Sequence, residues 1–351
     1  MAGSSFLWLV VLDCFFGGCN NINNCSLILS CKFRVEVMPL NSVIVRAPAS
    51  SANLGPGFDV FGLALQQPYD KVTLVNVSKG VKIHVSGLLA ETISVSPEYN
   101  TAGVVACRMI QEFSLKSGVL VKIEKGVLPG RGLGSSAASA AGVAFGMDRM
   151  FGLCLSTEEL IRFAAKGEVA SAGSEHADNV SAAICGNFVI IKSYDPLEIV
   201  KLKAPPNMEI CLAIPHMKTQ ANKTQKARSV VPKSVPLDKV VHNVGNAAAL
   251  ACGFALGDVD LIGRSMSDAI VEPARAFMIP GYQEVREKAF SAGACGVTIS
   301  GAGPTMLAVV NKEKVDSQRV LRAMKEGFGF VGLDSTVFVT KPGRGTCPME
   351  A

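Results

Sequence analysis

Residues 129–139 read PGRGLGSSAAS, which places three glycines within five residues directly before a run of Ser and Ala that favours a helix. Glycine allows backbone N–H groups to turn inward around an anion without steric cost. The helix that follows directs its own unpaired N–H groups and the positive end of its dipole at the same point. Ser135, Ser136 and Ser139 add hydroxyls that suit oxygen-rich ligands or Mg²⁺. The stretch therefore predicts a cradle for phosphate.

The two most common phosphate-binding loops do not fit this stretch. The P-loop requires GxxxxGK followed by Ser or Thr, and the chain contains no Gly-Lys dipeptide. The dinucleotide-binding fingerprint requires GxGxxG, but after Gly130 and Gly132 the third glycine position is occupied by Ser135. A purely structural alternative stays open at this point, in which Gly, Ala and Ser only allow close packing of the helix.

Further segments carry a resemblance to a known family. Residues 47–59 read APASSANLGPGFD, and residues 300–305 read SGAGPT after a predicted strand. With the Gly-rich stretch between them, they resemble the three signature motifs of the GHMP kinases. Residues 48–64 (PASSANLGPGFDVFGLA) and 167–180 (GEVASAGSEHADNV) look like the homoserine kinase branch rather than the sugar or mevalonate branches.

The resemblance runs from about residue 43 to about residue 342 and implies an α+β fold with two domains. We expect an N-terminal ATP-binding domain at residues 38–205 and a ferredoxin-like α+β domain at residues 206–351. Strands and helices mixed without a strict βαβ rhythm agree with this. Residues 1–37 are expected to be a disordered extension or a mis-called start, because Met38 opens a segment that leads directly into the first motif.

The composition predicts a cytoplasmic enzyme. A length of 351 residues is enough for two domains with cores of their own. A net charge of +5 and an aromatic content of 6% argue against nucleic acid as the partner. Eleven cysteines, an odd number without a credible zinc-binding pair, fit a reducing compartment. The apolar run at residues 6–16 is shorter than the roughly 20 residues that cross a bilayer, so we expect no membrane span.

Hydrophobic alternation, helical periodicity and turn signals predict the elements around the motifs. We expect a turn at residues 53–57, a linker at 204–207, and strands at 43–46, 71–77, 119–124, 187–192, 209–214, 296–299, 306–310 and 336–340. We expect helices at residues 136–151, 156–166 (opened by the capping box STEE), 238–256, 259–269, 282–292 and 312–326.

The resemblance assigns the nucleotide end of the site. Phosphoryl transfer needs a metal ion and donors that neutralise the phosphates, and Mg²⁺ prefers oxygen ligands. Ser136 and Glu168 match the family positions that hold Mg²⁺. ATP is expected to contact the whole Gly-rich stretch: Pro129, Gly130, Arg131, Gly132, Leu133, Gly134, Ser135, Ser136, Ala137, Ala138 and Ser139. The role of Arg131 is open between a phosphate contact and a solvent-facing side chain, because many relatives carry a small residue there.

The resemblance also assigns the acceptor end, where a hydroxy amino acid would bind. Such a substrate needs a carboxylate near its ammonium group and arginines near its carboxylate. Asp59 is expected to meet the ammonium group, and Arg228 and Arg275 the carboxylate. The hydroxyl end is expected to be lined by Asn53, His176, Asp178 and Asn179.

We predict no residue that acts as a dedicated catalytic base. The homoserine kinase branch carries Asn at the position where the mevalonate branch has its aspartate, and here Asn179 follows Asp178. We therefore predict catalysis mainly by positioning and electrostatic stabilisation, with Ser136, Glu168, Asp178 and Asn179 as the catalytic residues.

Together these features predict an ATP- and Mg²⁺-dependent kinase that phosphorylates the side-chain hydroxyl of L-homoserine. The resemblance further implies a role in threonine biosynthesis and a homodimeric state. One alternative is a GHMP kinase for another small acceptor, such as mevalonate or shikimate; a plain carboxylic acid would not require Asp59. Another is a non-catalytic nucleotide sensor, which would not need Ser136 and Glu168.

Overall fold

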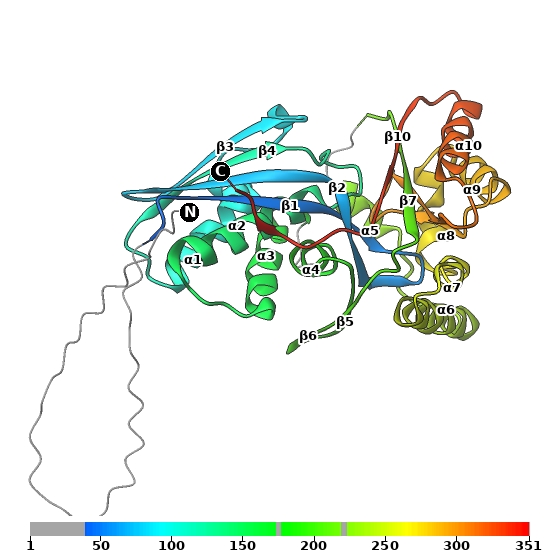
Figure 1. Cartoon of the computed structure of the whole chain (residues 1–351), viewed down its shortest axis with the longest axis horizontal. Coiled ribbons are helices and arrows are strands. Elements are labelled where there is room, and N and C mark those ends of the chain that lie inside the picture. Colours follow the sequence, from blue (N-terminus) through cyan, green and yellow to red (C-terminus); the bar gives the residue numbers. More distant parts are fainter. Residues whose placement is uncertain (1–38, 173–176, 219–222, 351) are drawn as a thin grey trace, which may run out of the picture.

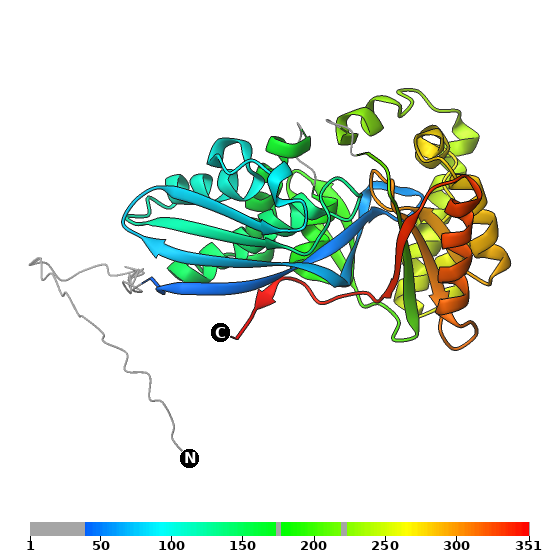
Figure 2. The ribbon, with the colours of Figure 1, turned by 90° about the horizontal axis from the view of Figure 1, so that it is seen from above.

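The computed structural model describes residues 39–172, 177–218 and 223–350, which form two lobes lying side by side (Figure 1 and Figure 2). The first lobe is built on a large sheet and the second on a smaller, four-stranded one. Both lobes combine strands with helices, so the predicted α+β fold is confirmed. None of the described helices is both long and apolar enough to cross a membrane.

The large sheet carries the first sequence motif at one end. Its strands are β1 (Ser42–Asn53), β2 (Gly57–Val77), β3 (Val81–Gly87), β4 (Gly118–Lys125), β5 (Phe188–Tyr194), β6 (Leu197–Leu202) and β11 (Cys347–Pro348). They follow the order β11-β1-β2-β4-β3, with β5 paired to β2 and β6 to β5. Only β3 and β4 run parallel among these pairs. The predicted turn joins β1 to β2, so the motif forms the tip of a hairpin.

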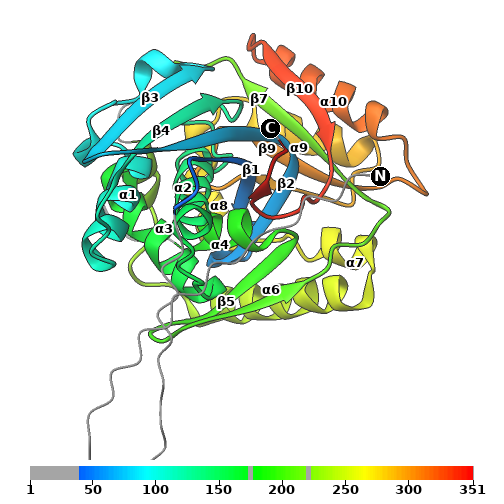
Figure 3. The same cartoon turned by 60° about the vertical axis from the view of Figure 1, so that its left-hand side comes forward.

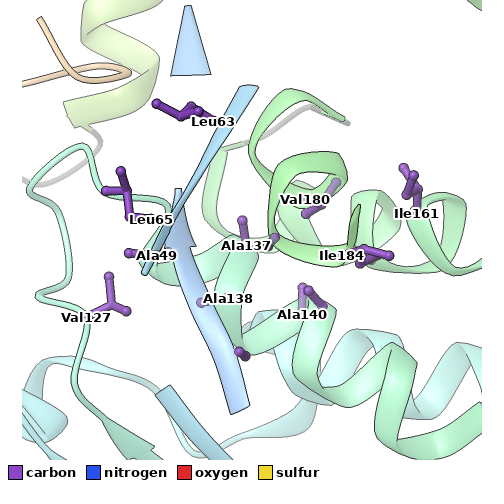
Figure 4. Close-up of a cluster of buried hydrophobic side chains, with 14 of the residues drawn as sticks. Ala49, Leu63, Leu65, Val127, Ala137, Ala138, Ala140, Ile161, Val180 and Ile184 are labelled. Atoms are coloured by element: carbon purple, nitrogen blue, oxygen red, sulfur yellow. The ribbon is translucent and has the colours of Figure 1, made fainter. Parts of the chain in front are cut away.

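Helices gather on one face of the large sheet (Figure 1). They are α1 (Thr101–Glu112), α2 (Ser135–Phe151), α3 (Thr157–Ala172) and α4 (Asp178–Cys185). The α2 helix lies at the centre of this layer, where small side chains allow close approach. Figure 4 shows Ala137, Ala138 and Ala140 of α2 in one buried cluster with Val180 and Ile184 of α4. Close packing therefore accounts for the alanines of the Gly-rich motif, but not for its glycines.

The second lobe has the topology that the resemblance implies. Its strands are β7 (Met208–Pro215), β8 (Gly296–Ile299), β9 (Met306–Asn311) and β10 (Ser335–Thr340). They pair antiparallel in the order β10-β7-β9-β8, the arrangement of a ferredoxin-like sheet. The helices of this lobe are α5 (Lys223–Ser229), α6 (Leu237–Leu256), α7 (Val259–Arg264), α8 (Val271–Arg275), α9 (Tyr282–Ser291) and α10 (Ser317–Phe330).

Both faces of the small sheet are buried, which explains its almost continuous apolar strands. On β7, Ile210 and Leu212 face a core shared with the first lobe, whereas Cys211 and Ala213 face α9 and α10. The β9 strand alternates in the same way. Because one core cluster contains side chains from both lobes, the lobes pack against each other as one body.

Several predicted elements differ from the structure. The helix expected from residue 312 begins at Ser317, because the Asp316 side chain accepts from the Gln318 N–H at 2.9 Å and caps the helix there. The helix expected to reach residue 269 ends at Arg264. The predictions lacked β3, β6, β11, α1, α4, α5 and α8. The domain boundary at residue 205 stays a prediction, and the last strand, β11, returns to pair with β1.

Candidate active site

A cavity of about 620 Å³ is lined by residues of both lobes. The Gly-rich stretch and the start of α2 form one part of its wall. The β1–β2 hairpin, α5, the end of α8 and the loop at residues 300–305 form another. The sequence motifs, which are far apart along the chain, therefore meet around a single cavity.

The three glycines of the cradle are required by its backbone shape. Gly130, Gly132 and Gly134 have φ angles of 68°, 78° and 63°, which L side chains rarely adopt. A Cβ at Gly132 would lie 2.3 Å from the Ser300 carbonyl oxygen, and one at Gly134 would lie 2.2 Å from Ser50 Oγ. The loop thus passes between other parts of the chain where only backbone fits.

The N-terminus of α2 keeps its backbone donors available for a ligand. Gly134 is the N-cap and provides no side-chain cap in the described structure. The first helical hydrogen bond runs from the Ala138 N–H to the Gly134 carbonyl oxygen at 2.8 Å. The N–H groups of residues 135–137 therefore precede the helical ladder and suit an anion at this end of the cavity.

The three predicted serine hydroxyls have different partners. Ser135 Oγ donates to the Val127 carbonyl oxygen at 2.9 Å, and Ser139 Oγ donates to Asp70 Oδ2 at 3.1 Å. Ser136 Oγ donates to Glu168 Oε2 at 3.0 Å. Ser135 and Ser139 thus brace the loop and helix, whereas the two predicted Mg²⁺ ligands lie together in the cavity wall.

The oxygen pair formed by Ser136 and Glu168 fits a divalent cation. Burial raises the pKa of the Glu168 carboxyl to about 7, although the hydrogen bond from Ser136 opposes the rise. A cation beside this buried carboxylate would replace the proton that burial favours. Among the described residues, no group of three or more His, Cys, Asp or Glu side chains could hold a metal ion. Mg²⁺ usually takes one or two protein ligands and completes its coordination with phosphate and water.

A buried ion pair that the sequence predictions lacked supports the cradle. Lys125 Nζ pairs with Asp70 and also donates to the Ser135 carbonyl oxygen at 2.9 Å. Both charged side chains are almost fully buried, and burial lowers the pKa of Lys125 while Asp70 raises it. A signal existed in the sequence, because Lys125 continues the inward-facing phase of β4.

Charged groups at the other end of the cavity pair with one another. Arg228 Nη2 lies 2.7 Å from Asp59 Oδ1 and 2.8 Å from Asp59 Oδ2. The Phe58 ring lies 5.2 Å from the Arg228 guanidinium and 5.0 Å from that of Arg275. One aromatic ring therefore holds both predicted carboxylate-binding arginines near the predicted ammonium-binding aspartate. Phe58 was not among the predicted site residues.

Arg275 and Asn53 both hold the loop at residues 300–305. Arg275 Nη1 donates to the Gly301 carbonyl oxygen at 3.2 Å, and its Nε donates to the Ala227 carbonyl oxygen at 2.8 Å. Asn53 Nδ2 donates to the same Gly301 oxygen at 3.0 Å, while its Oδ1 accepts from the Asp59 N–H. The Asn53 amide is thus engaged by backbone groups.

Asp178 and Asn179 are the first two residues of α4, and both line the cavity. Burial raises the pKa of Asp178 to about 6, against the hydrogen bond from the Asn179 N–H. Asn179 Oδ1 accepts from Ser50 Oγ at 3.0 Å, next to Gly134. Their neighbour in the predicted site, His176, lies outside the described residues.

Four predicted nucleotide-binding residues do not line the cavity with their side chains. Leu133, Ala137 and Ala138 are buried in the core beneath the cradle. Arg131 directs its guanidinium to the Pro215 carbonyl oxygen at 3.5 Å, and burial lowers its pKa. Any contact of Leu133, Ala137 or Ala138 with a ligand would therefore use the backbone.

Lys223, which the sequence predictions also lacked, joins the cradle to the second lobe. Its Nζ donates to the Gly130 carbonyl oxygen at 3.0 Å and also to that of Gly303. Burial lowers the pKa of Lys223 to about 7, and the nearby guanidiniums of Arg131 and Arg275 add to this effect. Lys223 lines the cavity, where a bound phosphate would raise this pKa again and favour the charged ammonium group.

Comparison with known proteins shows which family this chain resembles. The model of the GHMP kinases N terminal domain matches residues 100–187, and that of the GHMP kinases C terminal region matches residues 248–329. A homoserine kinase from Methanococcus vannielii is 47% identical over 278 residues, which cover 79% of this chain and 90% of that protein. One from Halorubrum lacusprofundi is 45% identical over 310 residues, covering 88% of this chain and 99% of the relative.

A solved structure gives the same result for the fold. The crystal structure of homoserine kinase from Cytophaga hutchinsonii superposes with a TM-score of 0.82 at 37% identity, covering 88% of this chain and 98% of that chain. The motifs, the topology and these relatives agree over nearly the full length of the proteins compared. The chain therefore belongs to the homoserine kinase branch of the GHMP kinase family.

Proposed function

We propose that this protein transfers the γ-phosphoryl group of ATP to the side-chain hydroxyl of L-homoserine and forms O-phospho-L-homoserine for threonine biosynthesis. In this reaction the homoserine hydroxyl oxygen forms the new P–O bond, while the bond from the γ-phosphorus to the β,γ-bridging oxygen breaks. We further propose a cytoplasmic homodimer, with an ATP-binding domain at residues 38–205 and a second domain at residues 206–351.

The observation that carries this proposal is the meeting of two chemically different ends in one cavity. One end offers backbone N–H groups, Ser136 and Glu168, which suit polyphosphate and a divalent cation. The other offers one carboxylate and two guanidiniums, from Asp59, Arg228 and Arg275, which suit an amino acid. An acceptor without an ammonium group would leave Asp59 without a substrate partner.

At the nucleotide end, the chain's own groups would hold and orient the phosphates. The N–H groups at the start of α2 would donate to phosphate oxygens, and Lys223 would add a positive charge. Ser136 and Glu168 would hold Mg²⁺, which when bound neutralises charge on the transferring phosphoryl group. Arg131, directed at Pro215, would stabilise the cradle from outside the cavity.

At the acceptor end, substrate binding would rearrange an existing ion pair. Asp59 and Arg228 neutralise each other, and both side chains are partly exposed. The ammonium and carboxylate groups of homoserine would insert beside them, so that each charge gains a second partner of opposite sign. Phe58 would keep the two guanidiniums in place during this exchange.

Asp178 and Asn179 would position the hydroxyl rather than remove its proton. The proton would pass to an oxygen of the transferred phosphoryl group and then to solvent. Asp178→Asn should therefore raise KM for homoserine more than it lowers kcat, and a large fall in kcat at unchanged KM would contradict this view.

The proposal is tested by ADP release from the purified full chain with MgATP and a panel of L-homoserine, L-threonine, mevalonate and shikimate. Turnover confined to homoserine supports both the reaction and the amino-acid end of the site. Turnover with mevalonate or shikimate would keep the kinase but refute the roles of Asp59, Arg228 and Arg275, whereas turnover with L-threonine alone would keep those roles and change only the acceptor. ATP binding without turnover of any acceptor would favour a nucleotide sensor.

A further inference from the structure

Tyr194, the last residue of β5, contacts the acceptor end of the site from outside the cavity. The β5 strand pairs with β2 and β6 and lies beside α4 (Figure 1 and Figure 3). Tyr194 is 50% exposed, and it was not among the predicted site residues. Its hydroxyl donates to the Asp59 carbonyl oxygen at 2.6 Å, across 135 positions of the chain. A surface side chain thus holds the backbone of the residue that is proposed to bind the substrate ammonium group.

The backbone of Asp59 has an unusual conformation that needs support. Its φ angle is 58°, in the left-handed region that residues other than glycine rarely adopt. The Asp59 N–H donates to Asn53 Oδ1 at 3.2 Å, so both of its backbone polar groups have side-chain partners. The Asp59 carboxylate, which pairs with Arg228 and lines the cavity, therefore takes its direction from a backbone that is held on both sides.

The sheet itself does not supply a partner for the Asp59 carbonyl group from β5. Residues 61–63 of β2 pair with residues 188–190 of β5, and this ladder ends two positions before Asp59. A backbone carbonyl group that lacks a ladder partner needs another donor. The hydroxyl of Tyr194 provides it, so the side chain continues the connection between the two strands beyond the end of the ladder.

A bulge precedes Tyr194 in β5. The register between β5 and β6 shifts between Ile191 and Ser193, which leaves Lys192 as an extra residue. Bulges of this kind turn the side chains that follow them, and they are common beside active sites. The bulge therefore gives a local reason why Tyr194 is directed toward the hairpin tip.

The same hydroxyl lies next to the start of α4. Burial and the carboxylates of Asp178 and Asp59 raise the pKa of Tyr194, whereas a hydrogen bond from the Ala177 N–H lowers it. Ala177 is the N-cap residue of α4, directly before Asp178. The hydroxyl is therefore located between the hairpin tip, which carries Asp59, and the helix start, which carries Asp178 and Asn179.

The start of α4 is fixed on β2, whereas the hairpin tip extends beyond that contact. A Cβ at Gly62 would lie 2.3 Å from the Asp178 carbonyl oxygen, so the strand and helix backbones meet there. Asn53 and Arg228 connect the tip to the second lobe, through the Gly301 carbonyl oxygen and through α5. Tyr194 instead connects the tip to the part of the first lobe that carries α4.

We propose that Tyr194 is a positioning residue that fixes the separation between the groups binding the two ends of the acceptor. This inference rests on the proposed function, in which Asp59 binds the ammonium group and Asp178 and Asn179 orient the hydroxyl. Three carbons separate the nitrogen and the hydroxyl oxygen of homoserine, so both contacts form together only at one separation of these groups. Tyr194 holds that separation and thereby favours an acceptor of this length.

Two ligands that differ by one hydroxyl test this inference. L-2-Aminobutyrate is homoserine without its hydroxyl, so it uses only the end of the site at Asp59. Isothermal titration calorimetry of the full chain without ATP gives a dissociation constant for each ligand. Tyr194→Phe should raise the dissociation constant of L-homoserine about 10-fold, but that of L-2-aminobutyrate by less than about 2-fold. KM for ATP should stay constant.

Tyr69→Phe is the matched control. Tyr69 lies on β2, where its ring packs against Arg46, and it does not line the cavity. This variant should leave all three constants within about 2-fold of the wild-type values. Far-UV circular dichroism checks that both variants fold, and L-2-aminobutyrate binding by Tyr194→Phe checks that its site is intact.

The outcomes separate this inference from the proposed function. Equal losses for the two ligands would overturn it, because Tyr194 would then support Asp59 alone and not its separation from α4. Unchanged binding of both ligands by Tyr194→Phe would also overturn it, while phosphorylation of homoserine by the wild-type chain would keep the proposed function. A wild-type chain that neither binds nor phosphorylates L-homoserine would refute the proposed function and this inference with it.

Discussion

Removal of the buried ammonium group beneath the cradle should cost far more stability than removal of an exposed one. In Lys125→Met, Asp70 would keep a buried negative charge without its cationic partner, and both side chains are 1% exposed or less. Breaking a buried pair in this way costs about 3–5 kcal/mol. Asp70 would still accept from the Gly126 N–H, the Val127 N–H and Ser139 Oγ at 3.0–3.1 Å. We therefore expect the lower end, about 3 kcal/mol.

The matched control is Lys192→Met, which breaks the ion pair between Lys192 and Glu198 on the surface. Their side chains are 66% and 46% exposed, so this loss should stay below about 1 kcal/mol. The free energy of unfolding is measured by urea titration with circular dichroism. The double variant Lys125→Met, Asp70→Asn should recover part of the stability, because it no longer leaves a buried charge unpaired.

Lys125→Met should also weaken ATP binding, because Lys125 donates to the Ser135 carbonyl oxygen at the start of α2 and lines the cavity. We expect KM for ATP to rise about 10-fold, which corresponds to one lost charge-assisted interaction. A Lys125→Met variant no less stable than Lys192→Met would refute the reasoning, since it would show that the pair adds nothing to the folded state.

Gly134→Ala should raise KM for ATP at least about 10-fold, because the left-handed φ and the contact of the new Cβ with Ser50 Oγ together cost about 1–3 kcal/mol. The control Gly329→Ala, whose Cβ would meet nothing within 4 Å, should leave KM for ATP unchanged. The raised pKa of Glu168 means that the folded state binds the proton of this carboxyl more tightly than the unfolded state does. The carboxyl therefore stabilises the fold fully below pH 4.5, and this contribution is lost as the pH rises through about 7. Without nucleotide and Mg²⁺, the wild-type chain should lose about 3 kcal/mol more than Glu168→Gln across that window in urea titrations, and equal losses would count against the burial of an ionisable carboxyl. Asp59→Asn should lower kcat/KM for homoserine about 10- to 100-fold while KM for ATP stays constant, and a parallel change in both would argue against a role at the acceptor end.

The local chemistry of the cradle could be predicted because it depends on consecutive residues. Backbone N–H groups that surround an anion need glycine at alternating positions followed by a helix start, and residues 130–136 carry that requirement in the sequence itself. The turn between β1 and β2, the helix α2 and most strands could be predicted for the same reason. Some elements that were absent from the predictions, such as α4 and α8, are only eight and five residues long.

The pairing of distant side chains depended on the path of the folded chain. Asp59 meets Arg228 across 169 positions, and Asp70 meets Lys125 across 55, distances over which periodicity carries no information. The resemblance identified Asp59 and Arg228 as charges for a substrate, but their mutual ion pair arises because the hairpin tip and α5 border the same cavity.

The sequence by itself determined which groups this protein can bring to phosphate and to an amino acid, because glycine spacing and residue type are local properties. The folded chain decided which of those groups face the cavity and which brace the backbone. These outcomes depend on how sheets and helices pack, and packing couples residues that the sequence keeps far apart.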